Sequence, residues 1–397
     1  MRSISRKNLG DPPLLTNLKP ELNILSDILH ITIETPMVGG GFEAGCVDKN
    51  HPFRVPSIRG NLRYWWRILN WYEADMPEKE NEIWGSTDKS SAVKIDIIEQ
   101  KSIGHNDMRK RDDNYGFDRY GPEAYALFSA NQNEKDILKE GTNFTLKLTY
   151  PEKFAHDVKL ALGAWIHFGG IGARTRRGCG TLSCSENIVS IGDILKANKN
   201  ITLWRKPPRD KTKALVAWNE VLEFYRRYRQ CRPRPRARSK WPEPDSLREL
   251  TGCRDPRHQN LIRQPELLPS FPRAALGLPI IFQFKNGNRY KDRPRSDLEP
   301  YNVTLTPKGK NQTRMASPVI TKAICEGGIW YSAVIILPHE HVYKLELETD
   351  IPKSVPDFLP VQSEFYKTLE PMRGCTDAIE GFEAFIASNR FNKEMIM

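Results

Sequence analysis

The chain has 397 residues, of which 39% are hydrophobic and 27% charged, a composition that suits two or three globular domains. It contains no run of 18 apolar residues and no apolar signal segment near its start, so we predict neither a membrane span nor secretion. The 60 Lys and Arg outnumber the 49 Asp and Glu, and the net charge of +11 favours a polyanionic partner, above all nucleic acid.

The cysteines indicate a reducing environment. There are seven of them, an odd number, and no two form a C-x-x-C pair. Because cytoplasmic thiols stay reduced and structural zinc needs paired ligands, we predict free thiols in a cytoplasmic protein, with no metal and no cofactor.

The first half predicts one unit that mixes helices and strands. Residues 1–24 contain three prolines and few periodic apolar residues, so we expect an irregular arm. Apolar residues alternate with polar ones at 29–33, 92–98, 144–150 and 181–184, which predicts strands, and have helical spacing at 57–72 and 157–168. Ser57 is the expected N-cap, and the polar run 101–119 is expected to be an exposed loop. The order is compatible with a ferredoxin-like β-α-β-β-α-β unit over residues 25–190.

The most distinctive stretch is GGIGARTRRGCG, residues 169–180, which we call the glycine loop. Glycine lets a backbone approach a ligand closely, and arginine supplies fixed charge in a planar fork of donors. The loop joins a helix to a strand, which excludes both the dinucleotide loop and the P-loop. We interpret it as a phosphate-binding loop, and the alternative is a basic surface turn. Its candidate RNA contacts are Gly169, Gly170, Gly172, Arg174, Arg176, Arg177 and Gly178.

A second basic surface is expected on the helix at 57–72. Arg59, Arg63 and Arg67 recur every fourth residue, on a different face from the apolar stripe. Like charges at this spacing repel, so we predict an anion between them, with a solvated basic face as the alternative. Trp66, outside the stripe, is a candidate for base stacking or for simple packing.

The third basic surface is the run from residue 226 to residue 240, which contains no acid. Pro233 and Pro235 forbid a helix there, and such a run can become ordered on RNA. Tyr225, Tyr228 and Trp241 lie nearby and favour nucleic acid over a solvated tail. The candidate contacts in the less regular part of the run are Arg232, Arg234, Arg236 and Arg238.

The second half predicts another α+β unit, over residues 205–397, into which this Arg-rich run is inserted. Helices are expected at 212–229, 242–250 and 378–391. Strands are expected at 278–284, 301–306, 318–325 and 329–337, and the first of these is apolar enough to be central. Arg314-x-x-Ser317 is a weak echo of Arg54-x-x-Ser57, which suggests duplication.

Three stretches together resemble one protein family. They are TPMVGGG…RVPSIRGNLRYWWR, GGIGARTRRGCGTL and WPEPDSLR…FPRAALGLPI…RMASPVI. They resemble the RAMP superfamily of CRISPR–Cas proteins, and among them most closely the first-numbered Cmr subunit of type III-B effector complexes.

The resemblance implies an α+β fold of two ferredoxin-like (RRM-like) units. It also implies a non-catalytic subunit near the 3′ end of the guide RNA, in contact with guide and target RNA and with other Cmr subunits. The residues that match the first motif are Arg54, Ser57, Arg59, Arg63 and Arg67, and those that match the third are Arg314 and Ser317. The Arg-rich run is richer in arginine than the family requires, so its role rests on charge alone.

Two other functions stay open. A metal-independent endoribonuclease needs a general base and a general acid, for which His30, His51 and His167 are candidates. Asp48, in the loop after the first strand, matches the place of a cleavage aspartate in a related backbone subunit, and a solvated loop acid is the alternative. Asp112 and Asp113 could hold magnesium but lack a third ligand on a rigid element. A purely structural subunit would instead use its arginines to dock on acidic partner proteins.

Overall fold

The computed structural model describes residues 23–71, 75–109, 115–132, 135–232, 238–253, 255–258, 269–284, 298–300, 302–308, 314–340, 345–348 and 363–395. The predicted arm therefore lies almost wholly outside the described residues. Within them the fold is α+β and its sheets are antiparallel, so the predicted fold class is confirmed at this level. No helix in the described part is long and apolar enough to cross a membrane.

The first unit is a four-stranded sheet in the order β3-β5-β1-β6. Its strands are β1 (Ile24–Ile33), β3 (Lys94–Gln100), β5 (Asn143–Pro151) and β6 (Leu182–Cys184). Helix α1 (Val55–Leu69) connects β1 to β3, and α4 (Ala155–Phe168) connects β5 to β6. All four strands and both helices were predicted from the sequence, with ends displaced by a few residues.

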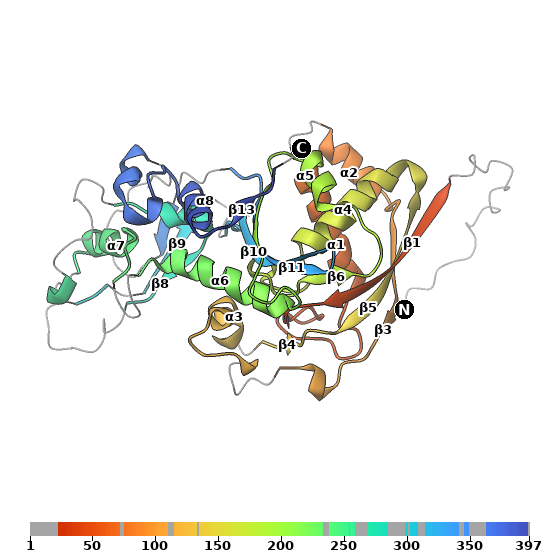
Figure 1. Cartoon of the computed structure of the whole chain (residues 1–397), viewed down its shortest axis with the longest axis horizontal. Coiled ribbons are helices and arrows are strands. Elements are labelled where there is room, and N and C mark those ends of the chain that lie inside the picture. Colours follow the sequence, from red (N-terminus) through yellow and green to blue (C-terminus); the bar gives the residue numbers. More distant parts are fainter. Residues whose placement is uncertain are drawn as a thin grey trace, which may run out of the picture.

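Helices cover only one face of this first sheet. Along β1, Leu29, Ile31 and Ile33 are buried and belong to the same core as residues of α1 and α4. The alternate residues Ile24 and Ile28 are 55% and 49% exposed. Side chains alternate between the two faces of a strand, so the opposite face of the sheet is open. Figure 1 shows α1, α2 and α4 grouped on one side of β1 and β5.

The second unit repeats the arrangement of the first. Its sheet has the order β10-β11-β7-β13. The strands are β7 (Thr202–Lys206), β10 (Val319–Glu326), β11 (Ile329–Ile336) and β13 (Asn392–Lys393). Helix α6 (Ala214–Gln230) follows β7, and α8 (Ala378–Ser388) precedes β13. In both sheets the strand that comes first in the chain lies between the third and the fourth.

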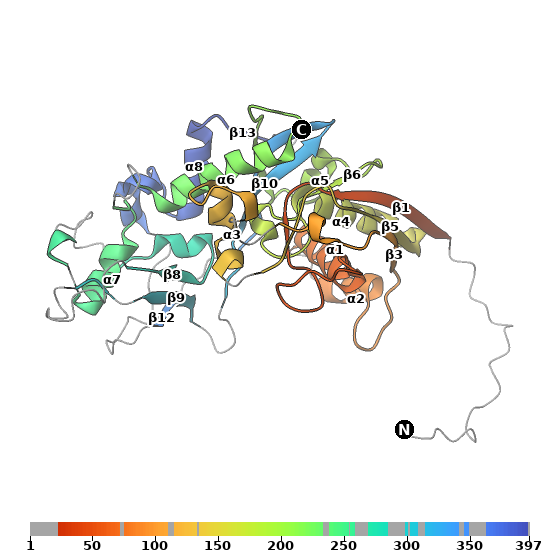
Figure 2. The ribbon, with the colours of Figure 1, turned by 90° about the horizontal axis from the view of Figure 1, so that it is seen from below.

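The second sheet is buried on both faces. Val319, Val334 and Ile336 pack in one core with residues of α6 and α8. Ile320 and Ile335 pack in the core of the first unit, on the side of α1 and α4. Strands buried on both faces read as continuous apolar runs, which explains the sequence of β10 and β11. The two units therefore share a core, and Figure 2 shows β10 between α6 and the helices of the first unit.

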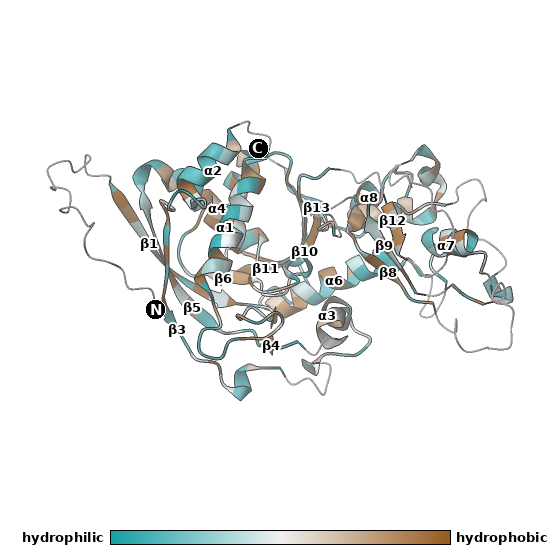
Figure 3. Ribbon diagram, turned by 180° about the vertical axis from the view of Figure 1, so that it is seen from behind, coloured by the Kyte–Doolittle hydropathy of each residue, from teal (hydrophilic) through white to brown (hydrophobic). Residues whose placement is uncertain are grey.

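Smaller elements surround these two sheets. The helices are α2 (Met76–Trp84), α3 (Pro122–Gln132), α5 (Ile191–Ala197) and α7 (Glu243–Thr251). A pair of short strands is formed by β2 (Met37–Val38) and β4 (Ile137–Leu138), and a three-stranded sheet by β8 (Ile280–Phe282), β9 (Val303–Pro307) and β12 (Leu345–Glu348). In Figure 3, α2 and α6 are banded teal and brown, as expected for helices with one buried face.

Three predictions about local structure are wrong. Ser57 is not the N-cap, because α1 already begins at Val55, with Arg54 at its N-cap position. The strand near 278–284 is not central: in the three-stranded sheet β8 lies at an edge, with Ile281 62% exposed. The run 101–119 is not uniformly exposed, since Tyr115 is buried and its hydroxyl donates to the carbonyl of Lys135 at 2.8 Å. Asp112 and Asp113 lie outside the described residues.

Candidate nucleic-acid interface

The glycine loop crosses from the end of α4 to β6 at the junction of the two units, and packing explains its glycines. Gly178 has a φ of +71°, and a Cβ on it would stand 2.6 Å from Cδ1 of Trp218 in α6. Gly172 has a φ of +83°, and its Cβ would meet Met37 of β2 at 2.7 Å. A Cβ on Gly169 would meet Trp65 of α1 at 2.5 Å. The glycines thus allow protein segments to approach one another.

Arg177 joins the glycine loop to the second unit. Its guanidinium donates to the carbonyl of Val319 at 2.8 Å and to the hydroxyl of Tyr225 at 2.6 Å. It also lies 4.1 Å from the centroid of the Tyr225 ring, a cation–π contact. Removal from water lowers the pKa of Arg177. Arg177 is therefore held by α6 and β10, which leaves its donors committed to the protein.

Arg176, next to it, reaches α1 instead of α6. Its guanidinium donates to the carbonyl of Ser317, just before β10, and to the hydroxyl of Tyr64 on α1 at 2.8 Å. Burial raises the pKa of Tyr64 despite the opposing effect of Arg176, so the phenol stays neutral. Arg176 thereby ties together the glycine loop, α1 and the Arg314–Ser317 motif, which the sequence analysis had treated as three separate features.

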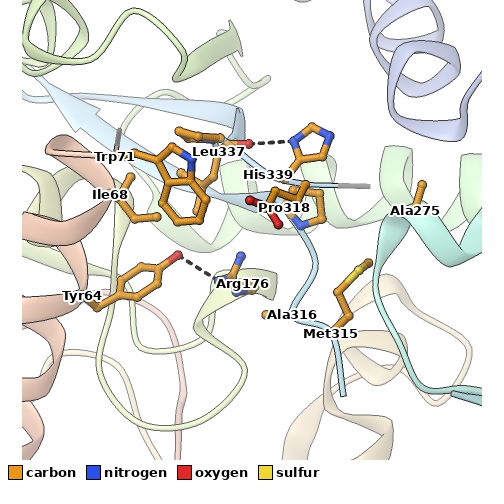
Figure 4. Close-up of a pocket in the computed structure, with 12 residues that line it drawn as sticks. Tyr64, Ile68, Trp71, Arg176, Ala275, Met315, Ala316, Pro318, Leu337 and His339 are labelled. Carbon is orange, nitrogen blue, oxygen red and sulfur yellow. Dashed lines mark hydrogen bonds between the residues drawn. The ribbon is translucent and has the colours of Figure 1, made fainter. Parts of the chain in front are cut away.

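Arg176 and Tyr64 lie on the wall of a cavity of about 280 Å³ between the two units. Figure 4 shows Trp71 and Ile68 on the α1 side, with Met315 and His339 on the side of the second unit. A neighbouring hollow of about 210 Å³ shares Tyr64 and Arg176 and extends to other residues of α1 and the glycine loop. We call the two together the junction groove. Its lining includes Asn61, Tyr64, Trp71, Arg176, Met315 and His339.

The aromatic wall of this groove was not predicted from the sequence. Asn61, Tyr64 and Ile68 follow one another at intervals of three or four residues, so they share one face of α1, and Trp71 lies in the turn just after the helix ends. This second face was visible in the sequence beside the predicted buried stripe. Nothing in the sequence showed that a second unit would stand opposite it.

Two of the three arginines on the other face of α1 share an anion, and the protein itself supplies it. Arg67 donates to both oxygens of Glu80 in α2, at 2.7 and 2.6 Å, and Arg63 donates to the same carboxylate. Burial opposes ionisation of Glu80, yet the bonds from Arg67 and Arg63 prevail and lower its pKa. Arg59 instead donates to the hydroxyl of Ser91 at 2.6 Å. Glu80 therefore compensates one of the three positive charges of this stripe within the first unit.

The aromatic residues proposed as stacking partners are buried. Trp66 is fully buried, and its indole N–H donates to Asp157 at 2.8 Å. Of the two alternatives for this residue, packing is therefore correct and base stacking is wrong. Tyr225, Tyr228 and Trp241 are also buried, so they give no support to RNA binding by the Arg-rich run. Within that run, Arg232 is exposed, Arg238 pairs with the buried Asp245, and Arg234 and Arg236 lie outside the described residues.

The remaining motif residues occupy two other places. Arg54 donates to the carbonyl of Gly41 at 2.9 Å, and Ser57 lies in the first turn of α1. Arg314 is exposed and directly precedes Met315 of the junction groove. Arg54 stands before the helix that follows the first strand of its unit, whereas Arg314 stands before β10, the second strand. The two motifs are therefore not equivalent in the repeated topology.

The three candidate bases lie in different surroundings. His30 on β1 is 64% exposed, and its Nδ1 lies 2.6 Å from Glu186. His51 is exposed, and its backbone N–H donates to Asp48, whose pKa is lowered by this bond and by that of Asn50. His167 contacts the carbonyl of Val189 through Nε2, and burial lowers its pKa to about 4. Only His30 combines an exposed ring with a carboxylate partner.

Residues 30–183 match the family model of the RAMP superfamily. The resemblance to the RAMP superfamily is confirmed. The matched RAMP segment includes α1, the glycine loop and thus Tyr64, Trp71 and Arg176.

Individual proteins are similar as well. The chain is 31% identical over 141 residues to the CRISPR system Cmr subunit Cmr1-1 of Pyrococcus furiosus, a match that covers 32% of this chain and 39% of that protein. The match thus spans about two-fifths of the length of this RAMP-related relative.

Solved structures align over more of the chain. The crystal structure of Cmr1 from Pyrococcus furiosus in its apo form aligns with a TM-score of 0.47 and 17% identity, covering 93% of this chain and 98% of that one. A chain of the type III-B Cmr-β complex bound to cognate target RNA and AMPPnP aligns with a TM-score of 0.45 and 15% identity, covering 80% and 95%.

Proposed function

We propose that the chain is a non-catalytic, RNA-binding subunit of a type III-B Cmr ribonucleoprotein complex in the cytoplasm. In this proposal it lies at the 3′ end of the guide RNA, contacts guide and target RNA and docks on other Cmr subunits. The similarity to Cmr1-1 supports membership of a Cmr complex, and the net charge of +11 supports binding to a polyanion such as RNA. The observation that carries RNA binding is the junction groove, with two aromatic rings beside an arginine.

The chemistry of the groove suits a single strand. Unpaired bases stack on aromatic side chains, and arginines meet the phosphates between them. Tyr64 and Trp71 are half-buried, so each keeps part of its ring accessible to a base. Arg176 is already oriented by Ser317 and Tyr64, so little side-chain entropy is lost on binding.

We also infer that both units are ferredoxin-like. The support is the strand order: in β3-β5-β1-β6 and in β10-β11-β7-β13 the chain runs strand, helix, strand, strand, helix, strand. The second unit contains two insertions. Helix α7 and strands β8 and β9 lie between α6 and β10, and strand β12 lies between β11 and α8. The Arg-rich run begins in the last turn of the repeated helix α6, and we propose that its part after Gln230 belongs to an insertion.

Binding of a labelled single-stranded guide RNA, measured by fluorescence anisotropy at several salt concentrations, tests the proposal. If about six to eight phosphates are contacted, affinity falls steeply as salt rises. Trp71→Ala is expected to weaken binding about tenfold, the loss expected for one stacked base. Tyr120→Ala is the matched control, because Tyr120 is a 75% exposed aromatic residue outside the groove. A flat salt response and an unaffected Trp71→Ala would favour protein docking instead.

One observation favours a second candidate function, metal-independent RNA cleavage. Glu186 accepts from the backbone N–H of His30 at 2.7 Å and lies 2.6 Å from its Nδ1, so it orients the ring. An oriented imidazole can act as a general base. Incubating guide RNA with the protein, with and without magnesium, separates the functions. We expect intact RNA, whereas a defined cut that disappears in His30→Ala would make the protein a nuclease.

A further inference from the structure

A single phenylalanine protrudes from the loop between β2 and α1. Phe42 is 87% exposed, the highest value for a large apolar side chain among the described residues. Its neighbours in the chain, Gly41, Glu43 and Ala44, have small or charged side chains. Exposed apolar patches that bind proteins are contiguous and cover hundreds of Å². A single exposed ring can instead be covered by one flat group of a binding partner that stacks on it.

The loop that carries this ring is held firmly. The N–H of Gly41 donates to the carbonyl of Cys46 at 2.9 Å, which closes the turn. Asp136 fastens its two ends: its carbonyl accepts from Gly39, and its N–H donates to Gly45, both at 2.9 Å. A Cβ on Gly41 would stand 2.8 Å from the carbonyl oxygen of Cys46, so the closed turn requires glycine there. The exposed ring is thus presented by a defined turn.

A cation stands beside the ring. The guanidinium carbon of Arg54 lies 5.8 Å from the Phe42 ring centroid, and one of its nitrogens donates to the carbonyl of Gly41 at 2.9 Å. Arg54 also lines an open hollow of about 410 Å³, together with His51 and Phe53. An aromatic face, a positioned guanidinium and an adjoining hollow therefore meet at one place, away from the junction groove.

We propose that Phe42 and Arg54 bind one unstacked nucleotide of a single-stranded RNA. The phenyl ring stacks on the base, and the guanidinium meets an oxygen of the adjoining phosphate. This inference rests on the proposed RNA-binding function and adds a second contact point on the first unit. Every base presents a π-face, so the site accepts any base.

The test compares Phe42→Ala with the wild-type protein in anisotropy titrations of labelled single-stranded RNA. Loss of one stacked base is expected to weaken binding about tenfold. Phe42→Trp, which keeps an aromatic face, is expected to restore wild-type affinity. Phe365→Ala is the matched control, because Phe365 is a 68% exposed phenylalanine in the second unit, and its affinity is expected not to change.

Salt separates the two parts of the site. Stacking involves no charge, so Phe42→Ala is expected to lower affinity by the same factor at low and high salt. Arg54→Gln removes one phosphate contact and is expected to reduce the slope of log affinity against log salt by about one. A 2-aminopurine base in the RNA reports stacking directly, because its fluorescence is quenched by wild-type protein and not by Phe42→Ala.

The possible failures are distinguishable. If the wild-type protein binds no RNA, the proposed function fails and this inference fails with it. If the wild-type protein binds RNA and Phe42→Ala binds equally well, only this inference is overturned. Normal RNA binding by Phe42→Ala combined with failure to assemble with Cmr subunits would assign the loop to protein docking, which also overturns it.

Discussion

The sheets of the two units have the same strand order but differ in how much of their surface is exposed to solvent. The first sheet is covered by helices on one face and is open on the other, where Ile28 is 49% exposed. The second sheet is covered by α6 on one face and by the first unit on the other. The repeat of topology therefore creates a shared core rather than two independent domains.

The connections differ as strongly as the sheets. In the first unit, residues 169–181 join α4 to β6, whereas in the second unit residues 389–391 join α8 to β13. The longer connection carries the glycines and arginines and reaches into the second unit, where the side chains of Arg176 and Arg177 bind residues at the start of β10. The first unit thus supplies the contact that fixes the junction groove, and the following predictions probe that asymmetry.

The largest effect is expected from Gly178→Ala. A residue with a side chain is strained at a φ of +71°, and the new methyl group would stand 2.6 Å from Trp218 and 2.8 Å from the carbonyl oxygen of Thr321. Backbone strain and overpacking together predict a loss of about 4 kcal/mol in the free energy of unfolding, measured by chemical denaturation.

Gly374→Ala separates the strain from the clash. Gly374 has a φ of +83° but no heavy atom within 4 Å of its would-be Cβ, so only strain of about 1 kcal/mol is expected. Equal losses in the two variants would mean that the glycine loop is not packed against α6.

The shared core predicts the next effect. Ile335 in β11 is fully buried against the first unit, so Ile335→Ala is expected to cost about 3 kcal/mol in the free energy of unfolding. Ile28→Ala, on the open face of the first sheet, is expected to cost less than about 1 kcal/mol. Hydrogen exchange should show that Ile335→Ala loosens α4 as well as β11. Loosening confined to the second unit would contradict a shared core.

A smaller, pH-dependent effect is expected from Lys322 on β10. It is fully buried, its ammonium donates to the carbonyl of Gly169 at 2.6 Å, and burial lowers its pKa to about 7 from 10.5. Above pH 7 only the unfolded chain holds this proton, so wild-type stability rises with pH. From pH 6 to pH 9 this contributes about 3 kcal/mol, which Lys322→Met should abolish.

The measurement is the unfolding free energy of both proteins at the two pH values. Lys322→Met is expected to stabilise the protein relative to wild type more at pH 6 than at pH 9. Lys94→Met, at a 72% exposed lysine, is the control and should leave the pH dependence unchanged. If the stability of Lys322→Met still depends on pH to the same extent, that dependence arises from other titratable groups.

Local periodicity predicted most of the fold. The alternation in β1 and β5 and the helical spacing in α1 and α6 were sufficient, because each of these elements buries one defined face, and α4 was predicted although it is buried on nearly every side. The sequence did not predict β7, which has only five residues, or α2, whose one buried acid, Glu80, is held by arginines of α1. A short element is stabilised mainly by residues from elsewhere in the chain that pack against it. Its own hydrophobic pattern contains little information about those contacts.

The candidate site was predicted less well for the same reason. Charge and glycine content identified the glycine loop and Arg176, but not that Arg177 faces inward to Tyr225. The arginine stripe was predicted to need an anion. That anion is Glu80, which reaches Arg63 and Arg67 only because α2 packs beside α1. Tyr64 and Trp71 become site residues only because the second unit stands opposite them.

Photocrosslinking tests the central claim, that the junction groove binds single-stranded RNA, most directly. Guide RNA that carries 4-thiouridine would be bound to the assembled complex and irradiated, and crosslinked peptides of this chain would be identified by mass spectrometry. We predict crosslinks to the peptides that contain Tyr64, Trp71 and Met315. Crosslinks confined to the Arg-rich run 226–240 or to the open face of the first sheet, with none in the groove, would contradict it.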